Sequence, residues 1–246
     1  MKILIALLML LLVSCSQPAE TQTRPQQQPP QPELAPPSGE LPTGTATTQD
    51  GQTISYALYE AQPGSPAVIL LHMLRRTRMD WDSVAKWLQR SGFTVIVPDL
   101  RGHGQSTGEL AVFKEEDYNK MIYDIGALKS ILQNQGADTK RLAIVGASVG
   151  ANVAYNYALT DADVKTVVLL SPGLDYKGIT VQPKSFSKTF LVVASKDDNY
   201  SAATAQEFQK NPKATIKMYE DAGHGTNMFA KNDLAPTILN WLKANV

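Results

Sequence analysis

The pentapeptide Gly-Ala-Ser-Val-Gly at residues 146–150 constrains this chain more than any other stretch. It directly follows an apolar run at residues 141–145 and leads into a helix-like segment that begins at Ala151. A strand, a sharp turn and a helix in this order place a serine at the apex of the turn, where only small residues fit on either side. The pattern therefore predicts an exposed Ser148 hydroxyl that a neighbouring base can activate.

Two further chemical groups follow Ser148 in the chain. A pair of acids, Asp197 and Asp198, comes directly after a later strand pattern, and His224 lies between two glycines after the last strand pattern. A serine hydroxyl becomes a good nucleophile when an imidazole removes its proton, and the imidazole needs a carboxylate to hold it in one tautomer. The order Ser, Asp, His therefore predicts a catalytic triad in which Asp197 or Asp198 is the acid.

Composition narrows the remaining possibilities. The 246 residues are 43% hydrophobic and 19% charged, which indicates one globular core. Lysine plus arginine and aspartate plus glutamate both number 23, so no nucleic-acid partner is expected. The single cysteine, Cys15, excludes an intrachain disulfide, and His72, His103 and His224 lack the close pairing of a zinc motif. We therefore expect neither a metal nor another cofactor.

The N-terminus has the pattern of a secretion signal that ends at a cysteine. Lys2 precedes an apolar run at residues 3–13 that is too short to span a membrane as a helix. The run ends in Leu-Val-Ser-Cys at residues 12–15, which resembles a bacterial lipobox. That resemblance implies a lipoprotein signal peptide at residues 1–14, cleavage before Cys15, and acylation of Cys15 with palmitate-like chains that hold the protein in a membrane.

The resemblance also implies an address in the bacterial cell envelope. Ser16 stands where an aspartate would retain a Gram-negative lipoprotein in the inner membrane, so the outer membrane is favoured if the host is Gram-negative. Residues 15–44 are rich in Pro and Gln and have almost no aliphatic side chains, which is typical of a semi-stiff tether. We expect the globular domain to span residues 45–246.

Strand and helix patterns alternate through the globular region. Residues 67–72 are continuously apolar, as in a strand buried on both faces, whereas residues 53–59 alternate as in an antiparallel edge strand. The alternation predicts an α/β class fold, a doubly wound and mostly parallel sheet with helices on both faces. The predicted strands are 53–59, 67–72, 93–97, 141–146, 164–170, 189–194 and 214–219, and the predicted helices are 80–90, 115–133, 149–159, 201–210 and 234–244.

A second motif, Asp-Leu-Arg-Gly-His-Gly-Gln-Ser at residues 99–106, follows one of these strands. Together with the serine turn it makes the chain resemble the α/β-hydrolase superfamily from about Ala67 onward, in particular compact serine esterases and the dienelactone-hydrolase-like group. The resemblance implies that the 99–106 loop is structural, that His103 is not the base, and that His224 is. Aligning the family's Gly-x-x-Asp strand end on Ser195 favours Asp198 as the acid; aligning it on Ala194 would select Asp197.

The resemblance also identifies donors for an oxyanion, which in this fold are backbone N–H groups. One is Val149, directly after the serine. The other follows the strand at 67–72, where the family has His-Gly-x and this chain has His72-Met73-Leu74. Leu74 is therefore the matching donor, although Met73 stands where the family has glycine.

Two loops bear on the substrate. Arg-Arg-Thr-Arg at residues 75–78 could attract an anionic substrate, or its charges could be balanced by Asp80 and Asp82. The segment between the strands at 164–170 and 189–194 is too short for a large helical lid, which suits small or solvent-exposed acyl groups.

The leading hypothesis is a serine hydrolase that cleaves small-molecule acyl esters outside the cytoplasm. A peptidase, thioesterase or lactone hydrolase could use the same triad, because one fold hosts many functions. A non-catalytic binding or scaffold protein of the envelope is the alternative of a different class. The presence of Ser148, Asp198 and His224 together argues against it, since a scaffold has no physical need for all three.

Overall fold

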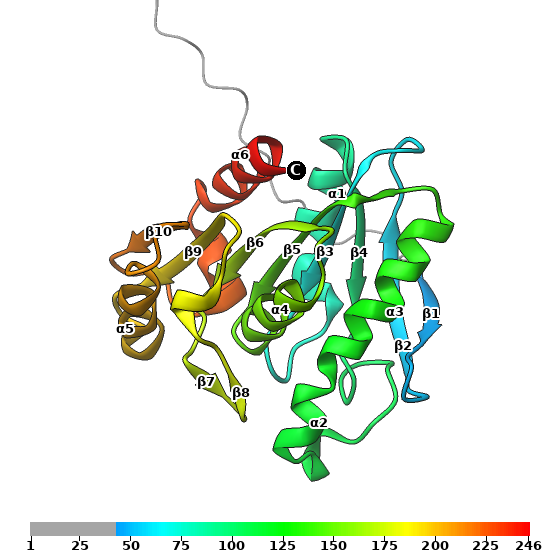
Figure 1. Ribbon diagram of the computed structural model, residues 1–246, viewed down its shortest axis with the longest axis horizontal. Helices are drawn as coiled ribbons and strands as arrows, with labels where there is room; N and C mark the ends of the chain where they lie inside the picture. Colours follow the sequence, from blue (N-terminus) through cyan, green and yellow to red (C-terminus); the bar gives the residue numbers. More distant parts are fainter. Residues whose placement is uncertain (1–42) are drawn as a thin grey trace, which may run out of the picture. The chain divides into compact units, whose positions relative to one another are not determined.

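Eight strands form one mostly parallel sheet in the computed structural model, which describes residues 43–246 (Figure 1). The strand order is β1-β2-β4-β3-β5-β6-β9-β10, and only β2 runs antiparallel to its neighbours β1 and β4. The strands of this sheet are β1 (Thr43–Thr47), β2 (Thr53–Tyr59), β3 (Pro66–Leu71), β4 (Thr94–Pro98), β5 (Asp138–Ala147), β6 (Val164–Leu170), β9 (Phe190–Ser195) and β10 (Ala214–Tyr219). A separate two-stranded hairpin consists of β7 (Asp175–Tyr176) and β8 (Ile179–Thr180).

Helices cover both faces of the sheet, which confirms the predicted α/β-hydrolase fold. Helices α3, α4 and α5 pack on one face, and α1 and α6 pack on the other (Figure 1). The helices are α1 (Asp82–Arg90), α2 (Glu115–Asn119), α3 (Met121–Asn134), α4 (Val149–Thr160), α5 (Asn199–Phe208) and α6 (Leu234–Asn245). Short 3-10 turns are η1 (Arg78–Trp81), η2 (Leu110–Val112), η3 (Pro183–Ser185) and η4 (Gly225–Ala230).

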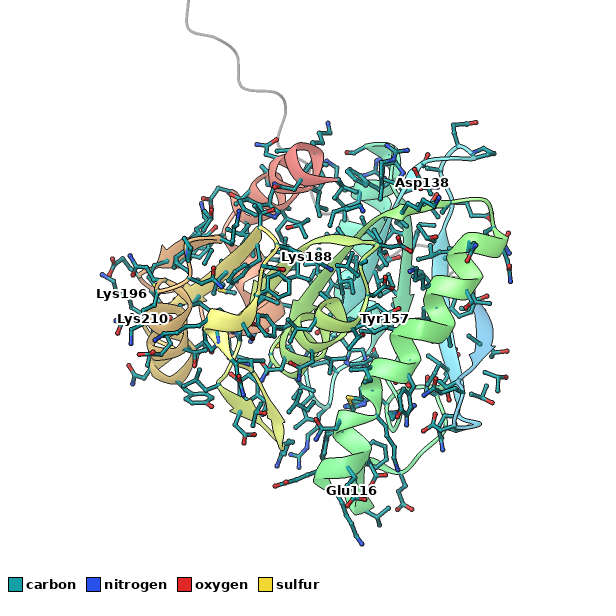
Figure 2. All side chains as sticks on the ribbon, viewed as in Figure 1. Glu116, Asp138, Tyr157, Lys188, Lys196 and Lys210 are labelled. Atoms are coloured by element: carbon teal, nitrogen blue, oxygen red, sulfur yellow. The ribbon has the colours of Figure 1, made fainter. Side chains whose placement is uncertain are left out.

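The core follows from the alternation of side chains along each strand. In β3, Ile69 and Leu71 point to the α3–α4 side, whereas Val68 and Leu70 point to the α1–α6 side, and all of them are fully buried. The continuous apolar run predicted for this strand therefore serves two hydrophobic layers. Side chains fill the space between sheet and helices, while charged residues such as Lys196 lie at the periphery (Figure 2).

The structure differs from the sequence interpretation at the sheet's edge. Strand β1 was not predicted, because its sequence Thr-Gly-Thr-Ala-Thr has little apolar character and only Ala46 is buried. It pairs antiparallel with β2, from Thr43 opposite Ala57 to Thr47 opposite Thr53. The prediction that residues 53–59 form the edge strand is therefore wrong, since β1 takes that position.

Two further differences are local. The helix predicted over residues 115–133 is interrupted at Lys120, which separates the short α2 from α3. The short β7–β8 hairpin has too few residues to show a period in the sequence. Among residues 43–246 no helix is both long and apolar enough to cross a bilayer. The predicted signal peptide, Cys15 and all but the last residues of the predicted tether lie outside the described residues.

The parallel strands bring several loops to one edge of the sheet. Residues Leu71 and Gly146 are register partners, as are Ala147 and Leu170, so the loops after β3, β5 and β6 begin side by side. Strands β9 and β10 end together on the same edge. Because ligands of such sheets bind at the carboxyl ends of the strands, this edge is where the candidate site is expected.

An aromatic cluster beneath α4 and α5 offers a test of the core. Phe190 is fully buried, with ring centroids 5.1 Å from Phe186 and 5.5 Å from Phe208. Replacing Phe190 by alanine should lower the free energy of unfolding by about 3–5 kcal/mol, because it leaves a cavity among these rings. The exposed Val112, replaced by alanine, should change it by less than about 0.5 kcal/mol. Urea unfolding followed by circular dichroism measures both, and equal effects would contradict this packing.

Candidate active site

Ser148 lies at a strained turn between β5 and α4. Its backbone has φ 54° and ψ −120°, a conformation that L-residues rarely adopt. A Cβ added to Gly150 would lie 2.7 Å from the carbonyl oxygens of Leu71 and His72, and one on Gly146 would collide with the backbone of Gly150. The two glycines are therefore required by close backbone approach, as the sequence pattern predicted.

The exposure of Ser148 differs from the prediction. The residue is only 6% exposed, so its hydroxyl is not open to solvent on all sides. The Ser148 N–H donates to Leu170 O at the end of β6 at 2.8 Å, and Tyr176 from β7 lies close to the Ser148 side chain.

An acid and an imidazole meet at the neighbouring strand ends. Nδ1 of His224, in the loop after β10, lies 2.6 Å from Oδ2 of Asp198, in the loop after β9. Burial of Asp198 opposes ionisation, but hydrogen bonds from Ser201 and His224 outweigh it and hold the pKa of Asp198 below its ordinary value. An ionised Asp198 fixes the Nδ1–H tautomer of His224 and leaves Nε2 as an acceptor.

Asp197 has a different set of partners. Its carboxylate accepts hydrogen bonds from the Ser195 hydroxyl and from the backbone N–H of Gly223, at 3.1 Å for the latter. The hydrogen bond from Ser195 lowers the pKa of Asp197 most. Burial acts to raise this pKa, and the backbone N–H bonds lower it further. Asp197 thus ties the end of β9 to the loop that carries His224, whereas Asp198 contacts the imidazole itself.

The helix after these acids begins earlier than expected. Helix α5 starts at Asn199, and Asp198 is its N-cap, with its side chain accepting from the Ser201 N–H. The helix predicted over residues 201–210 therefore begins two residues earlier than the sequence pattern indicated. An acidic side chain caps a helix as well as a serine does, so Asp198 both caps α5 and holds His224.

A tyrosine that the sequence reasoning missed lies beside this pair. The ring of Tyr176 packs edge-on to His224 with centroids 6.3 Å apart, and its hydroxyl lies 3.3 Å from Ser171 O and 3.3 Å from Ser201 Oγ. The only available signal was its position shortly after a parallel strand, at the carboxyl edge. The strands of the hairpin that holds Tyr176 have two residues each, too few to show a hydrophobic period in the sequence.

The loop after β3 is fixed by His72. Nδ1 of His72 donates to Met73 O at 2.7 Å, and Nε2 accepts from the Leu100 N–H at 2.9 Å. Burial lowers the pKa of His72 to about 4, so the ring is neutral and both nitrogens serve structure. Within residues 43–246 the N–H groups of Leu74 and Val149 have no acceptor, which leaves both available to an oxyanion.

Met73 occupies the position where the related sequences have glycine, and its role is now clear. The side chain is 7% exposed and its sulfur packs against Gly225, where any Cβ would overlap it. Residue Gly225 directly follows His224. Met73 therefore connects the proposed oxyanion loop to the histidine loop by direct packing.

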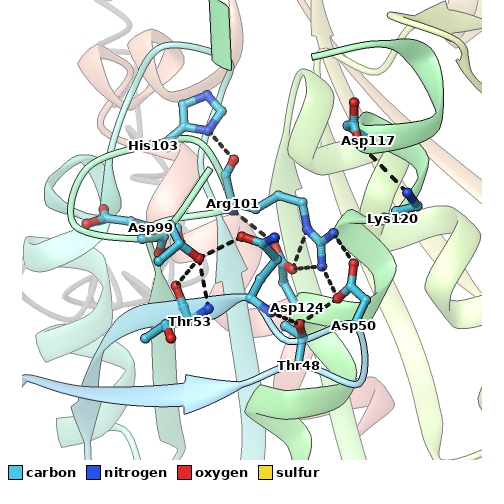
Figure 3. A network of polar contacts seen from close by, with 12 residues as sticks. Thr48, Asp50, Thr53, Asp99, Arg101, His103, Asp117, Lys120 and Asp124 are labelled. Carbon is cyan, nitrogen blue, oxygen red and sulfur yellow. Dashed lines mark hydrogen bonds and ion pairs between the residues drawn. The ribbon is translucent and has the colours of Figure 1, made fainter. Parts of the chain in front are cut away.

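The 99–106 loop is held by buried ion pairs, as the sequence resemblance implied (Figure 3). Asp99 accepts from the Arg78 side chain at 2.7 Å. Arg101 contacts Asp124 at 2.7 Å and Asp50 at 2.7 Å, so one guanidinium joins α3 to the turn after β1. These pairs fix the loop that in turn positions His72 through its backbone.

His103 lies in the same loop and has no part in the acid–base pair. Its Nδ1 lies 3.0 Å from Arg101 O, and its ring packs edge-on against His72 with centroids 4.9 Å apart (Figure 3). Burial lowers the pKa of His103 and keeps it neutral. The structure thus brings His224, and not His103, to the carboxylate.

The basic cluster at 75–78 is largely neutralised, with partners that differ from the expected ones. Arg76 pairs with Asp80 at 2.7 Å, as expected, but the buried Arg78 pairs with Asp99. Asp82 instead pairs with Lys86, one helical turn away. Of this cluster only the exposed Arg75 lacks an ion pair among residues 43–246.

In the described part of the chain no group of three or more His, Cys, Asp or Glu side chains is arranged to hold a metal ion.

Comparisons with known proteins agree with this fold. The profile of a family described as Hydrolase_4, "Serine aminopeptidase, S33", matches residues 62–222. The bifunctional esterase/perhydrolase DCH of Acinetobacter calcoaceticus is 33% identical over 204 residues, which cover 80% of this chain and 66% of that protein. The solved esterase Pf2001 of Pyrococcus furiosus superposes with a TM-score of 0.70 at 20% identity, covering 83% of this chain and 91% of that one.

Another relative shows how partial such matches can be. An uncharacterized protein of Mycobacterium tuberculosis is 36% identical over 118 residues, covering 47% of this chain. The chain spans about one third of the length of that relative, since the match covers 32% of it. The likeness to solved structures, at this level of identity, concerns the fold.

The two acids make a matched pair for testing the site. Asp198→Asn should lower the turnover of p-nitrophenyl acetate by up to about four orders of magnitude, because His224 loses the carboxylate that holds its tautomer. Asp197→Asn should lose far less, since it removes a loop contact and leaves the 2.6 Å His224–Asp198 bond in place. Steady-state kinetics on variants checked by circular dichroism decides. A large loss confined to Asp197→Asn would contradict the assignment.

Proposed function

Because the chain belongs to the Hydrolase_4 (serine aminopeptidase, S33) family and has the α/β-hydrolase fold, we propose that it is a serine hydrolase that cleaves carboxylic esters. The observation that carries this proposal is the 2.6 Å contact between His224 and Asp198 at the strand edge that also bears the strained Ser148. An imidazole paired with a carboxylate beside a serine at such a turn is the arrangement that acyl transfer requires.

In the proposed reaction Ser148 is the nucleophile and His224 is the base. Nε2 of His224 takes the Ser148 proton as Oγ bonds to the acyl carbon, and Asp198 stabilises the imidazolium through Nδ1–H. The carbonyl oxygen becomes an oxyanion, which accepts from the N–H groups of Leu74 and Val149. Val149 is the first residue of α4, so the helix N-terminus adds a favourable dipole.

Collapse of the tetrahedral intermediate completes acylation. The bond to the leaving oxygen breaks, the leaving oxygen takes the proton from His224, and the acyl group stays on Ser148 as an ester. Water then repeats the sequence with His224 as base, and the acid is released. No step requires a metal or another cofactor, because each proton moves between the substrate, water, Ser148 and His224.

The covering of the site favours small acyl groups. The connection between β6 and β9 contains only the β7–β8 hairpin and the η3 turn, so no helical lid is present in this segment. Ser148 is nevertheless only 6% exposed, and Tyr176 lies beside it. We expect short acyl esters to be turned over faster than long ones.

The family description favours one second candidate, a peptidase. The same triad can attack an amide, which differs from an ester mainly in its poorer leaving group. Amino-acid p-nitroanilides assayed beside p-nitrophenyl esters distinguish the two. The ester proposal expects turnover of acetate and butyrate esters and little release from the anilides, and the reverse order would favour the peptidase.

Ser148→Ala tests the nucleophile. The variant should lose hydrolysis of p-nitrophenyl acetate by about 10⁶-fold, because the triad acts as a unit, and it should no longer bind a fluorophosphonate probe covalently. Intact-protein mass spectrometry and circular dichroism measure labelling and folding. Stoichiometric labelling of a folded Ser148→Ala protein would show that the nucleophile is another residue. If the wild-type protein neither hydrolyses the ester nor binds the probe covalently, the whole proposal is rejected.

We also propose that the hydrolase is a lipoprotein of the bacterial cell envelope, anchored in a membrane through Cys15. The support is the sequence alone: the apolar run that ends in Leu-Val-Ser-Cys at residues 12–15 and the Pro/Gln-rich segment that follows it. Several acyl chains on one residue suffice for stable anchoring, whereas a single chain gives marginal binding. The location outside the cytoplasm would expose the enzyme to extracellular esters.

Cys15→Ser tests the anchor. In a bacterial host this variant should no longer incorporate labelled palmitate and should leave the membrane fraction, because the acylated thiol is gone. Ester turnover should be unchanged, since residue 15 lies outside the hydrolase domain. Palmitate incorporation by the Cys15→Ser protein at the wild-type level would contradict the proposal.

A further inference from the structure

Tyr176 is placed at the reacting groups with its hydroxyl directed to the strand edge. Its ring packs edge-on to His224, and its hydroxyl lies 3.3 Å from Ser171 O. Ser171 is the neighbour of Ser148 across the sheet, because Ala147 and Leu170 are register partners and the Ser148 N–H donates to Leu170 O. The phenol therefore stands beside both members of the proposed nucleophile–base pair.

Helix α4, which begins directly after Ser148, holds the hairpin that carries Tyr176 through side-chain hydrogen bonds. The Asn152 side chain, one turn after Ser148 in α4 and fully buried, donates to Gly173 O at 2.8 Å and to Ile179 O at 2.7 Å. Since these two acceptors flank the β7 strand and its turn, the hairpin is held on both sides. Tyr176 is thus a preorganised group and not a mobile flap.

Glycine at position 173 is needed for this packing. A Cβ there would lie 2.7 Å from the Tyr176 ring and 2.6 Å from the Tyr200 ring. The Tyr200 hydroxyl accepts from the Asp175 N–H at 2.9 Å and donates to Asp175 O at 3.0 Å. One tyrosine therefore clamps the hairpin's backbone, and the other faces the site.

The hydroxyl proton of Tyr176 makes only long hydrogen bonds in the free protein. Its two neighbours, Ser171 O and Ser201 Oγ, both lie at 3.3 Å, longer than the roughly 2.7–2.8 Å typical of an O–H···O bond. Burial first, and then the Asp198 charge, raise the pKa of Tyr176 to about 12 against opposing contacts with Ser201 and Ser148. The phenol is therefore a neutral donor at working pH, and its O–H can turn toward an oxygen that gains charge.

We propose that Tyr176 is a further catalytic residue, which donates a hydrogen bond to Ser148 Oγ as this oxygen leaves the acyl group in deacylation. The proposal rests on the function proposed above. In that step water adds to the acyl carbon and gives its proton to His224. The bond from the acyl carbon to Oγ then breaks, its electron pair stays on Oγ, and Oγ takes the proton from His224. Tyr176 keeps its own proton throughout.

Deacylation gains more from this donor than acylation does. In deacylation Oγ is the leaving group and collects negative charge, which a neutral phenol in a buried site stabilises. In acylation the Ser148 hydroxyl oxygen accepts the same hydrogen bond before it attacks, so the donor stabilises the ground state and the transition state alike, whereas the ester Oγ of the acyl-enzyme is a poor acceptor until its bond breaks. The donor therefore speeds one half of the reaction and leaves the other nearly unchanged.

Tyr176→Phe tests the proposal with Tyr157→Phe as the matched control. Phenylalanine keeps the ring against His224 and removes only the hydroxyl. Stopped-flow bursts with p-nitrophenyl acetate give acylation and deacylation rate constants separately. Tyr176→Phe should slow deacylation at least about tenfold and leave acylation within about threefold, so that kcat and KM fall together. Tyr157→Phe, which removes a hydroxyl that donates to Asp161 at 2.9 Å at the far end of α4, should keep both rate constants near wild type.

Each other result overturns the proposal. Unchanged deacylation in Tyr176→Phe would remove the donor role, and equal losses in both half-reactions would show a structural effect on the site. Fluorophosphonate labelling of Ser148 in the wild type distinguishes a failure of the Tyr176 role from a failure of the proposed function. If the wild type labels and turns over, only the role of Tyr176 fails; if it does neither, the proposed function fails and the Tyr176 role with it.

Discussion

The structure depends on the turn at Ser148. Its φ of 54° is a strained conformation, and the neighbouring backbones approach so closely that both Gly146 and Gly150 must lack side chains. The same approach sets α4 directly over the ends of β3 and β5. Everything else in the candidate site is arranged around this fixed point: a donor loop on the β3 side, and the acid, the imidazole and a tyrosine on the β6–β10 side.

Ion pairs between largely buried side chains fix the loop after β4, which supports the candidate site. Arg78 pairs with Asp99, and Arg101 pairs with Asp124 and Asp50, so the loop after β4 is tied to three other segments. Removing one partner of such a buried pair costs about 3–5 kcal/mol, because the other charge is left without compensation. These ion pairs therefore fix the loop whose Leu100 N–H holds His72 at the candidate site.

The sequence allowed the fold to be predicted where local pattern and tertiary structure agree. The apolar runs of β3, β6 and β9 and the glycines around Ser148 each have a local physical cause, and these predictions are confirmed. Pattern failed where pairing alone creates the element: β1 has almost no apolar face and exists because β2 offers a free edge. The β7–β8 hairpin is likewise made by side-chain contacts from α4 that lie far away in the sequence.

The site shows the same division. Chain order together with the family resemblance favoured His224, but they left two neighbouring acids, and only the three-dimensional positions separate Asp198 at the imidazole from Asp197 at the loop backbone. Tyr176 could not be found from spacing, since nothing local distinguishes it from Tyr200. Partners such as Asp99 for Arg78 also escaped, because ion pairs between distant segments leave no local pattern.

The central claim is that Ser148 carries the acyl group between two half-reactions of a triad with His224 and Asp198. Its most direct test is to mix the wild-type protein with p-nitrophenyl acetate, quench it with acid during the burst, and locate the acetyl group by peptide mass spectrometry. We predict one acetyl group per molecule, on the Ser148 side chain, which disappears when the quench is delayed until the ester is consumed. An acetyl group on another residue, or turnover with no acylated protein, would contradict the account.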